Sequence, residues 1–160
     1  MEISAVVTNS PAGHQAAVRT GGTTQSLSVA AKASGPGSAV NGGEFLMLAL
    51  ATCYCNDLYR EADRLGIAIS GVEVEASAEF PGIGLAATNV RYRARVSSSA
   101  SAHDVATLLR VTDAVAEVHN TLRAGVAVHL ESTPTAAAHK PAHPAERADA
   151  HAAPRGDAPM

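Results

Sequence analysis

The sequence predicts an α+β fold, in which antiparallel strands accompany one long buried helix and a second helix that packs against it. Three features of the chain support this prediction. Residues 41–66 combine a helix start signal with the longest apolar run, residues 67–97 alternate apolar and polar side chains, and residues 101–123 return to helical spacing. Strands and helices that are grouped in this way along a chain favour an α+β domain.

The predicted long helix, residues 41–66, contains both cysteines. Asn41 supplies a capping side chain, Glu44 places a negative charge in the first turn, and Gly66 follows the last periodic residue as a stop signal. Almost every residue from 45 to 55 is apolar or small, and this run is too short to cross a bilayer. We therefore expect about six turns of helix whose first half is buried in the core.

Before this helix, three short segments predict an antiparallel meander. Residues 2–8, 14–20 and 25–31 carry apolar side chains with a weak alternation, and turn sequences separate them. The two glycines at positions 21 and 22 favour a tight hairpin turn between the second and third segments. Residues 34–43 are rich in Gly, Ser and Pro and are expected to form a loop that leads into the helix.

After the long helix, residues 67–80 and 87–97 predict a hairpin of two longer strands. Glutamates alternate with Val and Ala in the first strand, and three arginines alternate with Val, Tyr and Ala in the second. Opposite charges that face one another across the ladder favour this pairing. A row of arginines also suits an anion or nucleic-acid site, but pairing with the glutamates on a solvated face is the better interpretation.

The rest of the chain predicts a second helix, a last strand and a tail. The helix spans residues 101–123 with Gly125 as its stop, and residues 126–130 have the composition of a strand. Residues 133–160 are rich in Ala, Pro and His, lack periodicity, and are expected to be a disordered tail. The predicted organisation is thus one folded domain, residues 1–132, followed by this tail.

Composition and charge exclude several classes of protein. A formal net charge of -3 without a cluster of Lys or Arg gives no basis for nucleic-acid binding. The first residues lack the features of a secretory signal, and two cysteines one residue apart make a poor disulfide framework, so we expect a cytoplasmic protein without a membrane segment. With only 3% aromatic residues, the meander has too few large side chains to cover the apolar helix alone. We therefore predict an intertwined homodimer with the cysteine helices near its interface.

The two cysteines allow more than one interpretation. A free cysteine in an apolar run is usually a small buried hydrophobe, whereas a nucleophilic thiolate needs a cationic or hydrogen-bonding partner and an opening to solvent. Because two residues along a helix are about 200° apart around its axis, Cys53 and Cys55 should point to opposite sides and form no disulfide within the helix. Without a third thiolate they are also a weak metal site, and we predict neither a metal nor another cofactor.

The segment NGGEFLMLALATCYCNDLYREADRLGI resembles the OsmC/Ohr superfamily of thiol-dependent hydroperoxide reductases, in which a nucleophilic cysteine lies in an Ala-Ala-Cys-Phe-like context. Residues 51–54 (Ala-Thr-Cys-Tyr) match that context, and the Thr-Gly-Gly turn at residues 20–22 and the segment 118–132 are also similar. Over residues 1–132 the resemblance implies an OsmC-like fold and an intertwined homodimer with two sites at its interface. It also implies cytoplasmic defence against oxidative stress, with an organic hydroperoxide as substrate and a thiol or dithiol as reductant.

The chain departs from that family at several positions. Ala116 and Glu117 stand where peroxide-reducing members have a resolving cysteine followed by proline. Thr23 stands where Ohr-type members have an arginine that activates the thiolate, and the nearest arginine is Arg19, just before the glycine turn. The helper glutamate of the family aligns with Gly43, one residue before the glutamate of this chain.

The catalytic set that the resemblance implies is therefore Cys53 as nucleophile, Arg19 as guanidinium, Glu44 as the carboxylate that orients it, and Cys55 as a second thiol. His119, on the second predicted helix, is better explained as a core or capping histidine than as a catalytic one. One hypothesis is thiol-dependent reduction of organic hydroperoxides through Cys53. The other is a non-catalytic OsmC-like protein that binds a small apolar ligand at the dimer interface. The pH dependence of Cys53 alkylation separates the two hypotheses.

Overall fold

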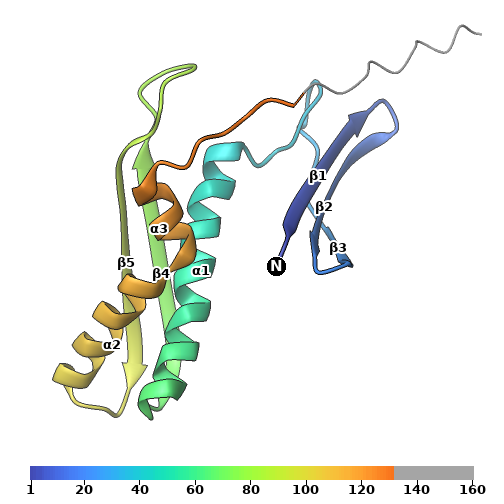
Figure 1. Cartoon of the computed structure of the whole chain (residues 1–160). Helices are drawn as coiled ribbons and strands as arrows, with labels where there is room; N and C mark the ends of the chain where they lie inside the picture. Colours follow the sequence, from blue (N-terminus) through green and yellow to red (C-terminus); the bar gives the residue numbers. More distant parts are fainter. Residues whose placement is uncertain (132–160) are drawn as a thin grey trace, which may run out of the picture. The chain divides into compact units, whose positions relative to one another are not determined.

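The computed structural model of the chain describes residues 1–131, which form two antiparallel sheets and three helices (Figure 1). The first sheet has the strand order β1-β2-β3, and the second sheet pairs β4 with β5. The predicted α+β class is therefore confirmed. In chain order the elements are β1 (Ile3–Ser10), β2 (Gly13–Thr20), β3 (Thr23–Leu27), α1 (Gly42–Leu65), β4 (Ile69–Glu79), β5 (Thr88–Ser98), α2 (Ala102–Val115) and α3 (Glu117–Ala124).

The three-stranded sheet is the predicted meander. β2 pairs with β1 on one side and with β3 on the other, and its second turn contains Gly21 and Gly22 with φ angles of 52° and 88°. A side chain would strain this left-handed backbone, which explains why glycines occupy both positions. β3 ends at Leu27, earlier than predicted, and a single bridge between Ala31 and Ser38 closes the loop that follows. Every residue of β1 and β3 is exposed, so the faces of this sheet are open in a single chain.

The long helix α1 has the predicted ends. The side chain of Asn41 accepts the backbone N–H of Glu44 at 3.0 Å, and Oε2 of Glu44 accepts the backbone N–H of Asn41 at 2.7 Å. This reciprocal pair is a capping box, which satisfies two amides that the helix itself leaves without partners. At the other end Gly66 has a φ of 69° and its N–H bonds to the carbonyls of Ala62 and Asp63. The pattern of caps in the sequence was therefore sufficient to define the helix.

The prediction that the first half of α1 is buried is wrong for a single chain. In this half Leu50 is buried, whereas Leu48 is 58% exposed. The buried residues lie mainly in the second half and include two acids, Asp57 and Glu61. The reason is that α2 and the β4–β5 hairpin pack against the later turns of α1, whereas α3 and β5 leave an open groove beside Leu46 and Leu50. A run of apolar residues does not by itself supply a neighbour that covers it.

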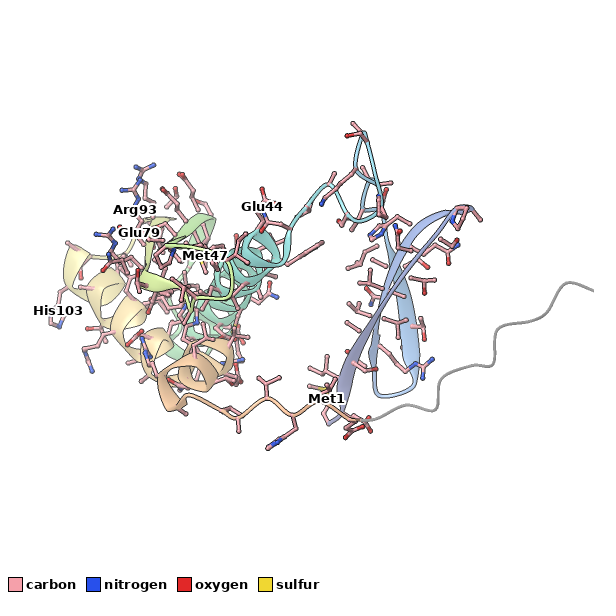
Figure 2. All side chains as sticks on the ribbon, turned by 90° about the horizontal axis from the view of Figure 1, so that it is seen from above. Met1, Glu44, Met47, Glu79, Arg93 and His103 are labelled. Carbon is pink, nitrogen blue, oxygen red and sulfur yellow. The ribbon has the colours of Figure 1, made fainter. Side chains whose placement is uncertain are left out.

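The hairpin of β4 and β5 forms as predicted, with opposite charges facing one another across the ladder. Glu73 lies opposite Arg95 and Glu75 lies opposite Arg93, with ion pairs of 3.1 Å and 2.5 Å. These four side chains are all more than half exposed, and Figure 2 shows Arg93 projecting away from α1. The arginine row is therefore a solvated face paired with glutamates, as predicted, and each exposed pair contributes little to stability.

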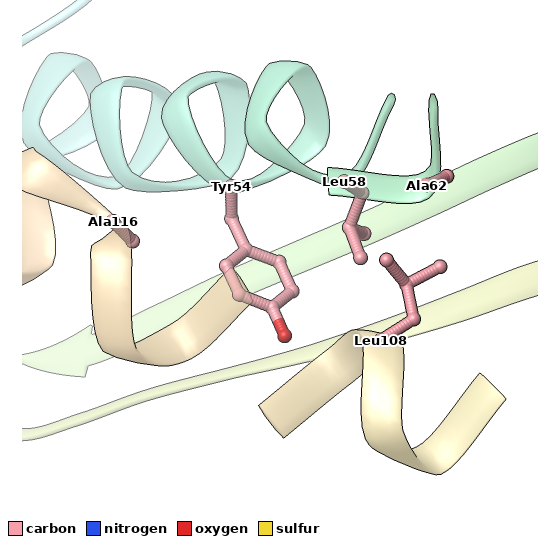
Figure 3. Close-up of a cluster of buried hydrophobic side chains, with 5 residues drawn as sticks. All are labelled: Tyr54, Leu58, Ala62, Leu108 and Ala116. Atoms are coloured by element: carbon pink, nitrogen blue, oxygen red, sulfur yellow. The ribbon is translucent and has the colours of Figure 1, made fainter. Parts of the chain in front are cut away.

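The core lies between α1, α2 and the inner face of the β4–β5 hairpin. Figure 3 shows Tyr54 and Leu58 projecting from successive turns of α1 toward the α2 side, where Leu58 faces Leu108, and Ala62 and Ala116 complete the cluster. All five are at most 3% exposed. Spacings of four residues place the α1 members on one stripe, which is the amphipathic pattern expected of a helix packed on one side.

The predicted second helix, residues 101–123, is interrupted at Ala116, and the prediction of one continuous helix is wrong. Ala116 has a ψ of 103° and is fully buried, so the chain turns there and starts again as α3. Side chains of α3 complete the end of α2. Asn120 donates to the carbonyl of Ala114 at 3.0 Å, and Arg123 donates to the carbonyl of Asp113 at 3.2 Å. The helical spacing of the sequence is compatible with either arrangement, so it could not reveal the break.

Residues 126–130 form no strand, contrary to prediction. Val128 and Leu130 are 96% and 100% exposed. A strand requires a hydrogen-bonding neighbour, and no described strand pairs with this segment. The predicted tail, residues 133–160, lies outside the described residues. Among residues 1–131, no helix is long and apolar enough to cross a membrane.

Candidate active site

Cys53 lies in the middle of α1 with its side chain half-buried. Its Sγ donates a hydrogen bond to Oδ2 of Asp57 at 3.4 Å, and it lies 4.0 Å from Oε2 of Glu117. Asp57 is buried, with 4% of its surface exposed, whereas the side chain of Glu117 is 70% exposed. The sulfur thus lies between two carboxylates, one from its own helix and one from the surface of α3.

Two local features of the chain bring these groups together. Asp57 follows Cys53 by four residues, which places it one turn further along the same face of α1. Glu117 reaches the sulfur because the chain turns at Ala116 and makes Glu117 the first residue of α3. The same turn is followed by Val118, whose backbone N–H lowers the pKa of the Cys53 thiol. The break in the second helix is therefore what completes the surroundings of Cys53.

Arg60 joins the two carboxylates on the side away from the sulfur. One guanidinium nitrogen, Nη1, lies 2.7 Å from Oδ1 of Asp57 and 3.8 Å from Oε1 of Glu117. The other oxygen of each carboxylate faces Cys53. Cys53, Asp57, Arg60 and Glu117 therefore form a closed ring of contacts, which we call the cysteine ring. Half of the Arg60 side chain remains exposed, so the ring is open to solvent on this side.

The thiol of Cys53 has a raised pKa. Burial is the largest cause, and the hydrogen bond to Asp57 and the charges of Asp57 and Glu117 raise the pKa further, while the backbone N–H of Val118 lowers it. A thiol with this balance is protonated at neutral pH. Within one chain the site therefore holds a hydrogen-bonded thiol and not a preformed thiolate.

The structure gives local contacts to two predicted site residues. The carboxylate of Glu44 is part of the capping box at the start of α1. It precedes Cys53 by nine residues, which corresponds to about 13 Å along the helix and to its opposite side. On β2, Nε of Arg19 donates to Oγ1 of Thr24 at 3.2 Å. Neither residue belongs to the cysteine ring, and their predicted roles toward a cysteine at a dimer interface stay predictions.

Cys55 lies outside the cysteine ring. The helix is continuous between the two cysteines, and both thiols are free. Positions 53 and 55 are about 200° apart around the helix axis, which keeps their sulfurs on different sides. A direct bond between the two sulfurs would therefore require the helix to unwind.

The cysteine ring offers three donor atoms for a cation. Sγ of Cys53 and one oxygen each of Asp57 and Glu117 all lie within 4.8 Å of one another. However, the guanidinium of Arg60 already pairs with both carboxylates. The arrangement is therefore that of an ion-pair network, and we assign no metal to it.

A second feature is an apolar groove of about 430 Å³ formed by α1, β5 and α3. His119 lines it and is 3% exposed, and neither of its ring nitrogens has a hydrogen-bond partner. Burial is the main cause that lowers the pKa of His119, and the charge of Arg123 adds to it. The ring packs against Tyr92 with centroids 4.3 Å apart. The prediction of a core histidine therefore agrees with its position. The complete lining is Leu46, Leu50, Ala87, Val90, Tyr92, His119, Leu122 and Arg123.

Sequence reasoning missed three members of the cysteine ring. Asp57 and Arg60 follow Cys53 at spacings of four and seven residues, so both lie on its face of α1, and this spacing was a usable signal. Glu117 gave no signal of this kind from spacing, although the resemblance aligned Ala116 and Glu117 with the resolving cysteine and proline of the family.

Comparison with known proteins identifies the family to which the chain is similar. Residues 35–131 match the family described as OsmC-like protein. Among solved structures, an OsmC-like protein from Mycoplasma pneumoniae has a TM-score of 0.56 at 17% identity and covers 76% of this chain and 86% of its own. A protein from Legionella pneumophila, described as an organic hydroperoxide resistance protein OsmC, has a TM-score of 0.54 at 14% identity, with coverages of 77% and 90%. An OsmC-like protein of unknown function from Vibrio cholerae has a TM-score of 0.52 at 16% identity and covers 76% and 93%.

These findings define the class of protein. The chain belongs to the OsmC-like protein family, because the family match covers more than half of its length. At identities of 14% to 17%, the similar structures establish the fold and not the activity. No curated protein matches the sequence.

Proposed function

We propose that the protein reduces organic hydroperoxides through the thiol of Cys53 and contributes to defence against oxidative stress. The observation that carries this proposal is a half-buried thiol within hydrogen-bond reach of a carboxylate that can accept its proton. Membership of the OsmC-like family supports it, as does the similarity to the Legionella pneumophila protein, which is described as an organic hydroperoxide resistance protein.

In the proposed reaction, Asp57 accepts the proton of Cys53 and the thiolate attacks the distal oxygen of the hydroperoxide. An S–O bond forms and the O–O bond breaks. The alkoxide leaves with a proton as the alcohol, and Cys53 becomes a sulfenic acid, so the sulfur is oxidised by two electrons while the peroxide is reduced by two.

The reduction of the sulfenic acid needs two thiol groups from outside the cysteine ring. One thiol condenses with the sulfenic acid to give a mixed disulfide and water, and a second thiol releases Cys53 and forms a disulfide with the first. Because Cys55 lies on another side of α1, we propose that an external dithiol or two small thiols carry out these steps. A reducing compartment such as the cytoplasm supplies them.

We further propose that the protein acts as a homodimer. The open faces of the three-stranded sheet and the exposed apolar side chains of the first half of α1 support this proposal, since a second copy would cover them. Arg19 and Glu44 then remain the predicted contributions of the interface to the site.

The test is turnover of cumene hydroperoxide with dithiothreitol as reductant. Cys53→Ser is expected to fall to the rate of the uncatalysed reaction, because serine cannot form the sulfenic acid. Thr52→Ser, at an exposed neighbouring position, is the matched control and should keep the parent rate. Equal consumption of the peroxide by Cys53→Ser and the parent protein would refute the proposal.

The raised thiol pKa and the apolar groove favour a second candidate, a non-catalytic protein that binds a small apolar ligand. Alkylation of Cys53 measured against pH distinguishes the two. A nucleophile has a thiol that reacts readily near neutral pH once the active assembly forms, whereas a binding protein keeps the thiol unreactive up to alkaline pH.

A further inference from the structure

We propose that Arg60 is the positioning residue of the Cys53 site, and that its positive charge offsets part of the negative charge of Asp57 and Glu117 and so favours ionisation of the thiol. The role of Arg60 in catalysis rests on the proposed function. The effect of Arg60 on the ionisation of the Cys53 thiol depends only on the charges around the sulfur. The sequence pointed to Arg19 as the guanidinium of the site. The geometry points to a guanidinium on the cysteine helix itself.

The first support is the way that Arg60 divides the two carboxylates. Its Nη1 contacts Oδ1 of Asp57 and Oε1 of Glu117, whereas Oδ2 and Oε2 are the oxygens near the sulfur. Each carboxylate thus stands between the positive charge and the thiol. The guanidinium can therefore hold both carboxylates in place through the oxygens that do not face Sγ.

The second support is the charge around the reacting atom. With Arg60 present, the two carboxylates and the guanidinium carry a summed charge of about -1, and without it the charge is about -2. A thiolate formed beside the larger negative charge is less stable, because like charges at this distance repel. Val118 N–H is the other group that favours the thiolate, and the buried His119 interacts with Asp57. Arg60 is therefore the one full positive charge among the groups of the cysteine ring.

Arg64 provides a matched comparison on the same helix. Its Nε lies 2.7 Å from Oε2 of Glu61, and its side chain is 58% exposed, against 50% for Arg60. Each arginine therefore holds a buried carboxylate three residues earlier in α1, and Nε of Arg60 also lies 3.4 Å from Oε1 of Glu61, so Glu61 lies between the two arginines. Glu61 has no contact with Cys53 among the described hydrogen bonds, whereas Asp57 accepts the thiol proton. A purely structural role predicts equal behaviour of the two arginines.

The experiment measures the rate of Cys53 alkylation by iodoacetamide from pH 6 to pH 11. All proteins carry Cys55→Ser, so that Cys53 is the one thiol that can be alkylated. Arg60→Gln should raise the midpoint of the titration by about 0.5 to 1 pH unit, which slows alkylation at pH 7 by about three- to tenfold. Arg64→Gln should leave the midpoint unchanged. An unmoved midpoint in Arg60→Gln, or an equal shift in Arg64→Gln, would overturn the inference.

Removing a charge beside a buried acid can also unfold a protein, so far-ultraviolet circular dichroism is recorded for each variant. Should Arg60→Gln fail to fold, Arg60→Lys compared with Arg64→Lys gives the same test. The side chain of lysine is shorter than that of arginine, so its ammonium should keep the contact with Asp57 but lose the contact with Glu117. The alkylation midpoint of Arg60→Lys should therefore rise by about half as much as that of Arg60→Gln, and the midpoint of Arg64→Lys should not change. No shift at position 60, or the same shift at both positions, again contradicts the inference.

The same proteins separate this inference from the proposed function. If the parent protein does not reduce cumene hydroperoxide, the proposed function fails, yet the alkylation titration still tests Arg60. If the parent protein turns over and Arg60→Gln retains both its titration midpoint and its rate, the proposed function stands and the role of Arg60 is rejected.

Discussion

The two halves of α1 bury their side chains to different extents. Residues 42–51 form the most apolar stretch of the chain, yet one of them, Leu50, is buried. Residues 52–65 carry most of the charges of the helix, and five of them are buried, including Asp57 and Glu61. The cysteine that defines the candidate site lies where the two halves meet.

An apolar composition shows that a segment is more stable when it is buried. It does not show that the same chain provides the residues that bury it. The second half is covered by α2 and the β4–β5 hairpin, and its buried acids are stabilised by Arg60 and Arg64. In the described part of one chain the first half is covered less completely, because Leu48 is exposed and Leu46 and Leu50 line an open groove. Exposed apolar side chains of this kind are typical of surfaces that contact another molecule.

The largest expected effect concerns the packing of the second half. Leu58→Ala removes a fully buried side chain that faces Leu108, so the free energy of unfolding should fall by about 2 to 5 kcal/mol. Leu48→Ala, in the first half and 58% exposed, should cost less than about 1 kcal/mol in a single chain. Urea unfolding at low protein concentration measures both values.

The comparison of Leu58→Ala with Leu48→Ala tests whether the two halves of α1 are covered to different extents. A loss in Leu48→Ala as large as that in Leu58→Ala would mean that the first half is fully covered in solution, and the contrast between the halves would disappear. A dependence of the Leu48→Ala effect on protein concentration would assign the cover to a second copy.

The second prediction addresses that second copy directly. A homodimer should sediment with about twice the chain mass of 16.2 kDa. Leu48→Glu places a charge in the proposed interface and should weaken dimerisation by about tenfold or more, as measured by sedimentation equilibrium. Asp63→Ala, at an exposed position in the second half, is the control. Monomeric parent protein, or equal masses for Leu48→Glu and the parent, contradicts the proposed dimer.

The smallest expected effect lies at the junction of the halves. In Asp57→Asn, the thiol of Cys53 loses a negatively charged acceptor that raises its pKa, so thiolate should form at lower pH. The alkylation midpoint should move down by about 0.5 to 1 pH unit, and alkylation at pH 7 should be about three- to tenfold faster. Peroxide reduction should nevertheless slow, because the proton acceptor is gone.

Asp63→Asn controls for the loss of one carboxylate from α1, since Asp63 is exposed and has no described contact with Cys53. It should leave the alkylation midpoint where it is. An Asp57→Asn protein with an unchanged or higher midpoint would mean that the carboxylate does not act on the sulfur, and the assignment of Asp57 as proton acceptor would be withdrawn.

Much of the architecture could be predicted because its signals are local. The capping box of Asn41 and Glu44, the stop at Gly66 and the charge alternation of the hairpin each depend on residues close together in the chain or on directly paired strands. The break at Ala116 could not be predicted in this way. It depends on the burial of that alanine and on side chains of α3 that bond to the end of α2.

In the candidate site, too, some residues could be predicted from the local sequence and others could not. Cys53 could be found from its context, and Asp57 and Arg60 lie at spacings that place them on its face of α1. Glu117 and the N–H of Val118 reach the sulfur because α2 and α3 are separate helices. The predicted roles of Arg19 and Glu44 depend on contacts between chains and stay predictions.

The sequence alone determined the two turns of the β1-β2-β3 meander, the ends of α1, the pairing of acidic and basic strands, and the position of the candidate cysteine. These features depend on capping hydrogen bonds, turn residues and side-chain alternation among residues that are close together in the chain. Only the tertiary structure decided which half of α1 is buried and which charges surround the sulfur. Burial and electrostatic fields are properties of neighbours that pack together in space, and residues as far apart in the chain as Cys53 and Glu117 become neighbours only after the chain has folded.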